Sequence, residues 1–320
     1  MKKLYFCTFL FFLSFQFLFS QGSGDSNVTL FGNIAPSFKN KDEFTKVSFF
    51  TRIDKGKNNV HSIAPILNYE TNINEQLDFQ LWITSKYATG DLASGFSLGD
   101  INLFGTYHLD ENFLINEIDQ SIDFGLTLSL SGGKKLKKSL SNNFYATYPM
   151  EYQSSLGTID LILGYTIKSN IFNFSLGFQQ ALTSKNQNNF FPTYFDLGEI
   201  NDDYPASNEM KRSGNIYSRV GYFIINEKKK LLNLGLTSFY KLNNDKYFVN
   251  NPNTSYPTKG YNEALNTKGL SLNSVLQFNY KLNKNAEISL YTGIGIINNE
   301  QTIDGLLRNY FITPGFTWNL

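Results

Sequence analysis

Cysteine and histidine are almost missing from the chain, which removes the residue types that many enzymes and metal sites use. The one cysteine, Cys7, lies in the apolar N-terminal run, so we expect no disulfide, thiol catalyst or cysteine-bound metal in the mature chain. The two histidines, His61 and His108, stand in no hydrolase motif, and a serine nucleophile needs such a base within reach. We therefore expect no catalytic centre, no metal site and no cofactor.

Long apolar runs are also missing after the first twenty residues. Mean hydropathy is slightly negative, although the chain has 30 Phe and 19 Tyr. A helical membrane protein would be more apolar, because each span needs about 20 apolar residues. A membrane β-barrel would not, because half of each strand faces the lumen. The balance of 28 Lys and Arg against 27 Asp and Glu lacks the basic excess expected of a nucleic-acid-binding protein.

The single apolar run is typical of a secretory signal peptide. Lys2 and Lys3 precede the apolar stretch, which ends in small residues at Ser20 and Gly22. We predict a signal peptide over residues 1–22, with a retained helical anchor as the alternative, then a pre-barrel segment over 23–43 and a barrel domain over 44–320. Within the pre-barrel segment Val28–Phe38 alternates as well, and we interpret it as lying near or inside the periplasmic mouth, because counting it as a barrel strand gives thirteen.

Alternation of apolar and polar residues is the main structural signal. Leu77–Thr84 keeps one face apolar, with Trp82 the only apolar residue opposite, and Ile101–Leu109 does the same, with Phe104 as its one exception. Period two predicts strands with two differently solvated faces, and runs of about ten residues fit a tilted transmembrane strand. The other runs lie near residues 44–54, 60–70, 122–130, 157–168, 171–181, 214–225, 231–242, 268–282, 286–297 and 306–319.

Short and long connections alternate between these runs. Bacterial barrels have short periplasmic turns and longer outer loops, with both termini on the periplasmic side. The count under this rule is twelve, so we predict an all-β protein, a transmembrane antiparallel β-barrel of about 12 strands. Two alternatives stay open at this point: a 14-strand barrel with one strand missed, and a soluble β-sandwich, whose strands also alternate.

Six aromatic residues recur in the apolar phase near the short connections. Amphipathic rings at strand ends predict a girdle at the membrane interface, here the periplasmic one. The C-terminal strand, with Trp318, resembles the signal read by the barrel-assembly machinery, although Leu320 replaces the usual last aromatic. The predicted girdle consists of Tyr69, Tyr107, Tyr165, Tyr222, Tyr280 and Trp318.

Alternation also predicts which charged side chains point into the lumen. Arg219 falls nearest mid-depth, and Arg52, Asp100 and Asp160 fall toward the outer half, so these four are candidates for a constriction. Opposed charges there would form a transverse field that orients a polar solute, whereas the alternative is internal ion pairs that satisfy one another. Because many amides accompany them, we expect a wet lumen that is restricted by side chains.

Two outer loops carry clustered charge. Lys134–Lys138 is basic and could meet anionic lipid phosphates, although a solvated loop face is the simpler interpretation. The loop over residues 182–213 is acidic, and we expect it to lie at the surface and fold over the outer mouth.

The segment Phe96–Tyr107 resembles the Gly-Asp-hydrophobic strand opening of outer-membrane proteins grouped as phenol meta-pathway transporters. Its sequence is FSLGDINLFGTY, and Ala64–Tyr69 with its tight turn into Leu77–Ile83 fits the same layout. The resemblance covers roughly residues 60–110 and implies an outer-membrane barrel that passes small hydrophobic or aromatic compounds.

These observations predict a channel in the outer membrane of a Gram-negative type cell, through which a small solute moves passively. Its expected partners are outer-membrane lipid, the assembly machinery and the solute, and no nucleic acid. A non-transporting surface barrel whose outer loops bind a partner or lipid is the alternative. A barrel hydrolase is a third class, which lacks a recognisable catalytic set.

Overall fold

The structure is a computed structural model that describes residues 45–56, 59–109, 118–129, 137–141, 144–183, 185–192, 204–251, 258–297 and 308–320. The predicted signal peptide and pre-barrel segment, including Val28–Phe38, lie outside the described residues. Most of the basic loop Lys134–Lys138 lies outside them as well.

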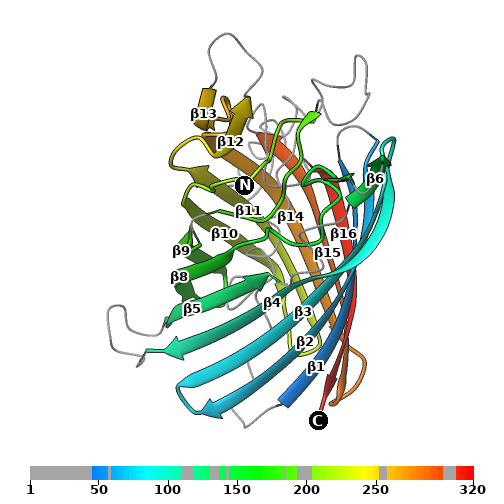
Figure 1. Cartoon of the computed structure of the whole chain (residues 1–320). Coiled ribbons are helices and arrows are strands. Elements are labelled where there is room, and N and C mark those ends of the chain that lie inside the picture. Colours follow the sequence, from blue (N-terminus) through cyan, green and yellow to red (C-terminus); the bar gives the residue numbers. More distant parts are fainter. Residues whose placement is uncertain are drawn as a thin grey trace.

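A closed antiparallel barrel dominates the described part of the chain, and twelve strands form it (Figure 1). Neighbours in sequence are neighbours in the barrel, and β1 pairs with β16 to close it, for example Phe49 opposite Phe316. The predicted 12-strand barrel is therefore confirmed, and the 14-strand alternative is wrong. The barrel strands are β1 (Thr45–Gly56), β2 (His61–Asn74), β3 (Leu77–Thr89), β4 (Ser94–His108), β5 (Asp119–Ser129), β8 (Ile159–Lys168), β9 (Phe172–Ala181), β10 (Asn215–Asn226), β11 (Lys230–Lys241), β14 (Gly269–Lys281), β15 (Ala286–Ile297) and β16 (Arg308–Asn319).

Two small hairpins stand outside the barrel, within the described residues, and the sequence did not predict either. The first consists of β6 (Lys137–Ser141) and β7 (Phe144–Thr147), and the second of β12 (Lys246–Asn251) and β13 (Thr258–Glu263). They interrupt the long outer connections between β5 and β8 and between β11 and β14. Both lie toward the outer end of the barrel, opposite the C-terminus (Figure 1).

The two faces of each strand differ as period two requires. On β1 the outward Phe49 and Ile53 are exposed, whereas Ser48 and Arg52 are buried on the inner face. Burying polar side chains while exposing large apolar ones is unfavourable in water, but it is what a lipid-facing barrel requires. This distribution shows that the soluble-sandwich alternative is wrong. Within the described ranges, no helix is long and apolar enough to cross a membrane.

The short turns are stabilised by side chains that bind backbone N–H groups. Asn74 Oδ1 accepts from the backbone N–H groups of Gln76 and Leu77 at 3.0 and 2.9 Å, and Ser169 Oγ accepts from that of Phe172 at 3.1 Å. Such Asx and Ser turns reverse the chain within a few residues. They help to fix the registers of the β2–β3 and β8–β9 hairpins. Of the predicted girdle, Tyr69, Tyr107, Tyr222 and Trp318 are exposed on the outer face, and Tyr165 and Tyr280 are half-buried there.

Candidate functional site: the barrel lumen

The four candidate constriction residues all point inward and are buried. Arg52 is 5% exposed, Asp100 and Arg219 are 1% exposed and Asp160 is 0% exposed. Burial of this degree requires polar compensation, because an uncompensated charge inside a protein is strongly unfavourable. Each of the four has hydrogen-bonding or ionic contacts.

Arg52 and Asp100 each belong to a small polar group on the inner wall. Arg52 Nε donates to Asp54 Oδ2 at 3.0 Å, and Ser62 Oγ donates to the same oxygen at 2.9 Å. Asp100 Oδ1 accepts from Ser129 Oγ at 2.8 Å. The Arg52–Asp54 contact is an internal ion pair, as the alternative interpretation of the inward charges expected.

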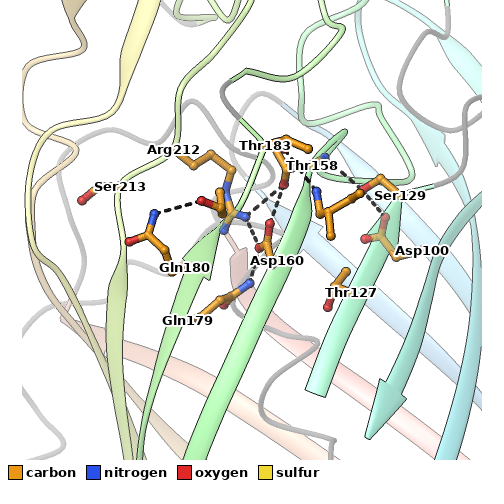
Figure 2. Close-up of polar contacts among 12 residues, drawn as sticks. Asp100, Thr127, Ser129, Thr158, Asp160, Gln179, Gln180, Thr183, Arg212 and Ser213 are labelled. Atoms are coloured by element: carbon orange, nitrogen blue, oxygen red, sulfur yellow. Dashed lines mark hydrogen bonds and ion pairs between the residues drawn. The ribbon is translucent and has the colours of Figure 1, made fainter. Parts of the chain in front are cut away.

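Asp160 has three partners among the described residues (Figure 2). Arg212 Nη1 forms an ion pair with Asp160 Oδ2, Gln179 Nε2 donates to the same oxygen at 2.6 Å, and Thr158 Oγ1 donates to Oδ1 at 2.6 Å. Arg212 is 8% exposed and belongs to the connection between β9 and β10, not to a barrel strand. This pair could not be predicted from the sequence, because alternation assigns no inward or outward face to a loop residue.

Three connecting segments with many buried residues lie at the outer mouth, and we call them together the outer cover: residues 148–158, 185–192 and 204–213. Lys86 Nζ on β3 donates to the backbone carbonyls of Glu151 at 2.7 Å and Gln153 at 3.1 Å. Ser154 Oγ donates to the carbonyl of Leu98 at 2.8 Å. Described residues of the 182–213 loop lie beside residues 148–158, since Asn188 Nδ2 donates to the carbonyl of Tyr148 at 3.0 Å. Asp196, Glu199, Asp202 and Asp203 lie outside the described residues.

Two tyrosines join the segments of the outer cover. The hydroxyls of Tyr152 and Tyr204 lie 3.2 Å apart, and their rings pack with the buried Phe190 and Val60. Burial is the main cause that raises the pKa of both hydroxyls above the ordinary value of 10.0. Both therefore stay protonated at neutral pH, which preserves their hydrogen bond.

The outer cover is also joined to the β12–β13 hairpin by backbone hydrogen bonds. Lys211 and Lys246 exchange a pair of them at 2.8 and 2.9 Å, and the Phe248 N–H donates to the Asn208 carbonyl at 2.8 Å. Lys211 Nζ lies 3.7 Å from the centroid of the Tyr261 ring on β13, a cation–π contact. The hairpin and the last cover segment thus form one unit.

A small polar cavity lies between the outer cover and the inner wall. Its lining includes Arg52, Thr84, Lys86, Asp100 and Ser155. The space open to a water-sized molecule is about 20 Å³, enough for about one water. This space is too small for an organic solute.

A belt of apolar side chains lines the inner wall at mid-depth. Phe50 and Trp82 stack at 5.6 Å with 14° between their planes, and Tyr291 meets Phe50 edge-on at 6.2 Å. We call this set the aromatic belt. Its buried members are Phe50, Ile66, Trp82, Phe104, Ile162, Tyr217, Phe239 and Tyr291, with Phe311 packed against them.

Glycines on neighbouring strands let these rings lie along the wall. A Cβ at Gly315 would clash with the ring of Phe50, and one at Gly177 would clash with Tyr217. The Tyr217 hydroxyl extends across β9 to the carbonyl of Leu163 on β8, at 3.3 Å. A missing side chain in a strand interior often marks such a close approach.

Polar side chains continue on the periplasmic side of the belt. Thr106 Oγ1 and Thr166 Oγ1 donate to the two oxygens of Asp123 at 2.7 and 2.9 Å. Arg219 Nη2 donates to Asn233 Oδ1 at 3.4 Å. These side chains are buried, and the expectation of a wet lumen stays a prediction.

The two histidines lie at opposite ends of the barrel. His108 Nε2 lies 2.7 Å from Asp78 Oδ2 near the periplasmic end, whereas His61 is exposed at the start of β2. Ser62, the hydroxyl next to His61 in sequence, is buried on the inner face and bonds to Asp54. Among the described residues, no group of three His, Cys, Asp or Glu side chains could hold a metal ion.

The closed sheet, the apolar outer face and the polar inner face define the class: a transmembrane β-barrel of the outer-membrane type. No protein-family model and no curated protein matches the chain. The structure is similar to that of an outer membrane channel from Pseudomonas putida F1, with a TM-score of 0.52 and 11% identity over 87% of this chain and 96% of that one. The KdgM and NanC porins align with TM-scores of 0.42 and 0.43, at 8% and 10% identity, over 86% of this chain and 99% and 100% of theirs. The first likeness concerns the fold alone, and membership of the phenol meta-pathway family stays a prediction.

Proposed function

We propose that the protein is a passive channel for a small solute in the outer membrane of a Gram-negative type cell, closed at its outer mouth in this conformation. The observation that carries the proposal is how the outer cover is attached. Side-chain contacts, chiefly the Asp160–Arg212 pair and Lys86 with two backbone carbonyls, bind it to the polar inner wall. Contacts of this kind can break and re-form without disturbing the backbone hydrogen bonds of the barrel.

The lumen on either side of the aromatic belt offers a polar route. Ionisable side chains occur near its periplasmic end, where Lys46 and Glu70 lie 3.8 Å apart, at Arg219, and at Asp160 near the outer end. Arg52, Asp100, Asp160 and Arg219 are the residues that we propose to line the constriction. Lipid on the outer face and the assembly machinery at the C-terminal strand complete the proposed partners.

Conductance of the purified full-length protein in planar bilayers tests the proposal. We expect discrete current steps that are rare in the wild type and frequent when the outer cover is loosened by Asp160→Asn. Bilayers that stay silent for both proteins would contradict the channel and favour a non-transporting surface barrel whose outer loops bind a partner or lipid.

We also propose that the barrel is not a hydrolase. His61 is exposed beside an inward-facing Ser62, so the two side chains do not meet. Release of fatty acid or peptide that disappears in His61→Ala would contradict this.

A further inference from the structure

Two different walls face each other across the lumen. The order of strands in the barrel places β10 six positions from β2, on the opposite side. The β1–β4 side carries Phe50, Ile66, Trp82 and Phe104 of the aromatic belt. The β9–β14 side carries two further members of the belt, Tyr217 and Phe239, together with Arg219 and a larger set of carboxamides: Asn173 on β9, Asn233 on β11, and Gln277 and Asn279 on β14. The β1–β4 side has fewer amides, at Asn68 and Asn102.

The aromatic side offers rings that are held in place. Phe50 and Trp82 are stacked on each other, and Phe50 lies against the bare backbone of Gly315. Rings fixed in this way are platforms on which a flat, partly apolar ring can stack at little further entropic cost. The belt therefore supplies a stacking surface in the middle of an otherwise polar lumen.

Polar side chains along the lumen, some of them next to the belt, include polar atoms without a hydrogen-bond partner among the described residues. Seven side chains that point into the lumen each carry one buried polar atom with no hydrogen-bond partner within the described part of the chain: Asn68 Oδ1, Asn102 Nδ2, Asn173 Nδ2, Gln179 Oε1, Thr237 Oγ1, Ser289 Oγ and Thr313 Oγ1. Buried polar atoms are rarely left unsatisfied, so such a group calls for a water or a ligand. The set contains amide N–H donors, carbonyl acceptors and hydroxyls that act as both.

Three charge pairs of the lumen neutralise themselves and so favour no ionic solute. Cations and carboxylates lie next to each other, as in Lys46–Glu70, Arg52–Asp54 and Asp160–Arg212. A solute that matches this lumen is uncharged, has a flat apolar ring face, and carries several hydroxyls that both donate and accept. A simple aromatic compound has the ring but not the hydroxyls.

We propose that the layer around the aromatic belt binds neutral saccharides, stacking a sugar ring on Trp82 and Phe50 while its hydroxyls bond to the surrounding amide and hydroxyl side chains. The proposal rests on the proposed channel function, since it names the solute class of the same lumen. Phe50 and Trp82 are 7% and 4% exposed, so the sugar reaches them only in a conformation in which these rings are uncovered.

The chain contains 2 Trp, and this makes a direct binding assay available. Trp82 lies in the lumen and Trp318 on the outer face, so Trp318→Phe leaves Trp82 as the only indole. Full-length Trp318→Phe protein, with Arg212→Gln added to loosen the outer cover, is titrated with maltotriose in detergent. We expect a saturable change of Trp82 emission, and the same sugar should interrupt the ion current in bilayers.

Two variants locate the contact. Phe50→Leu, which retains Trp82, should weaken maltotriose binding by about 3- to 10-fold, because a stacked aromatic contact contributes roughly that factor. Thr237→Val removes one unpaired hydroxyl at constant shape and should weaken it less, whereas Phe49→Leu on the lipid face is the matched control and should leave it unchanged.

The outcomes separate the two proposals. Ion current without any effect of maltotriose on current or emission would overturn the saccharide site and leave the channel intact. Saturable binding of benzoate in place of maltotriose would overturn the solute class in favour of aromatic compounds. Silent bilayers combined with saturable, Phe50-dependent maltotriose binding would overturn the channel and support the saccharide site.

Discussion

Replacing Asp160 by asparagine removes the carboxylate that holds Arg212, and with it the last segment of the outer cover, to the inner wall. The pair is buried on both sides, and the asparagine retains the shape but not the charge. Removing one partner of a buried ion pair typically costs about 3–5 kcal/mol, because the other charge stays behind uncompensated. Release of the cover returns Arg212 to water, so this cost acts on the closed state and favours the open one.

The expected effect on gating is large. A shift of about 3 kcal/mol changes an equilibrium by roughly a hundredfold. Single-channel recording of Asp160→Asn should therefore show an open probability at least tens of times higher than that of the wild type, even if the cover relaxes in part. The double variant Asp160→Asn/Arg212→Gln leaves no uncompensated charge and should open less than the single variant.

An exposed ion pair of the same outer cover supplies the control. Lys185 Nζ and Glu209 Oε2 lie 2.5 Å apart, but their side chains are 47% and 36% exposed. Exposed pairs contribute little, because water solvates both charges when they separate. Lys185→Gln should leave gating almost unchanged, and an Asp160→Asn channel that opens no more often than Lys185→Gln would refute the assigned role of the buried pair.

Three further predictions follow from the inner wall and the outer cover. Gly177→Ala should lower the free energy of unfolding by about 1–3 kcal/mol, because the added Cβ would overlap the ring of Tyr217. Gly260→Ala should have little effect, because nothing lies within 4 Å of its Cβ. Urea titrations in which unfolding is monitored by heat-modified gel mobility measure both effects. Arg219→Ala should shift the reversal potential toward cation selectivity in a salt gradient, and an unchanged potential would remove Arg219 from the constriction. Because burial raises the pKa of Tyr152 and Tyr204, both hydroxyls stay protonated in the closed state at a pH at which they ionise in the open state, above about 10.0. The closed state should therefore become less stable, and the open probability should rise, as the pH increases above 10.0. Tyr204→Phe should make the open probability less dependent on pH.

The strands could be predicted from the sequence because lipid imposes a strict rule on them. Every second side chain must be apolar on the outer face, and this marks all twelve barrel strands and the inward direction of Arg52, Asp100, Asp160 and Arg219. Even the aromatic belt has a signal, since Trp82 and Phe104 are apolar residues in the polar phase of their strands. An apolar residue that breaks the alternation therefore indicates an apolar contact inside the barrel.

The outer cover could not be predicted in the same way. Its segments have no periodicity, so nothing local shows that Tyr152 meets Tyr204 or that Arg212 meets Asp160. Alternation also predicts which side chains face the lumen, but it does not predict whether water or protein fills the lumen. The covered interior and the two small hairpins therefore depend on contacts between distant residues.

The backbone hydrogen bonds between Lys211 and Lys246 and between Asn208 and Phe248 have a mechanical consequence. These hydrogen bonds join residues 204–213 of the outer cover to the β12–β13 hairpin. While they persist, residues 204–213 can leave the mouth only if the hairpin moves with them. A molecule that binds the hairpin from outside the barrel can therefore control the position of this segment. An antibody fragment that clamps the hairpin against the rim should hold the channel shut without ever entering the lumen.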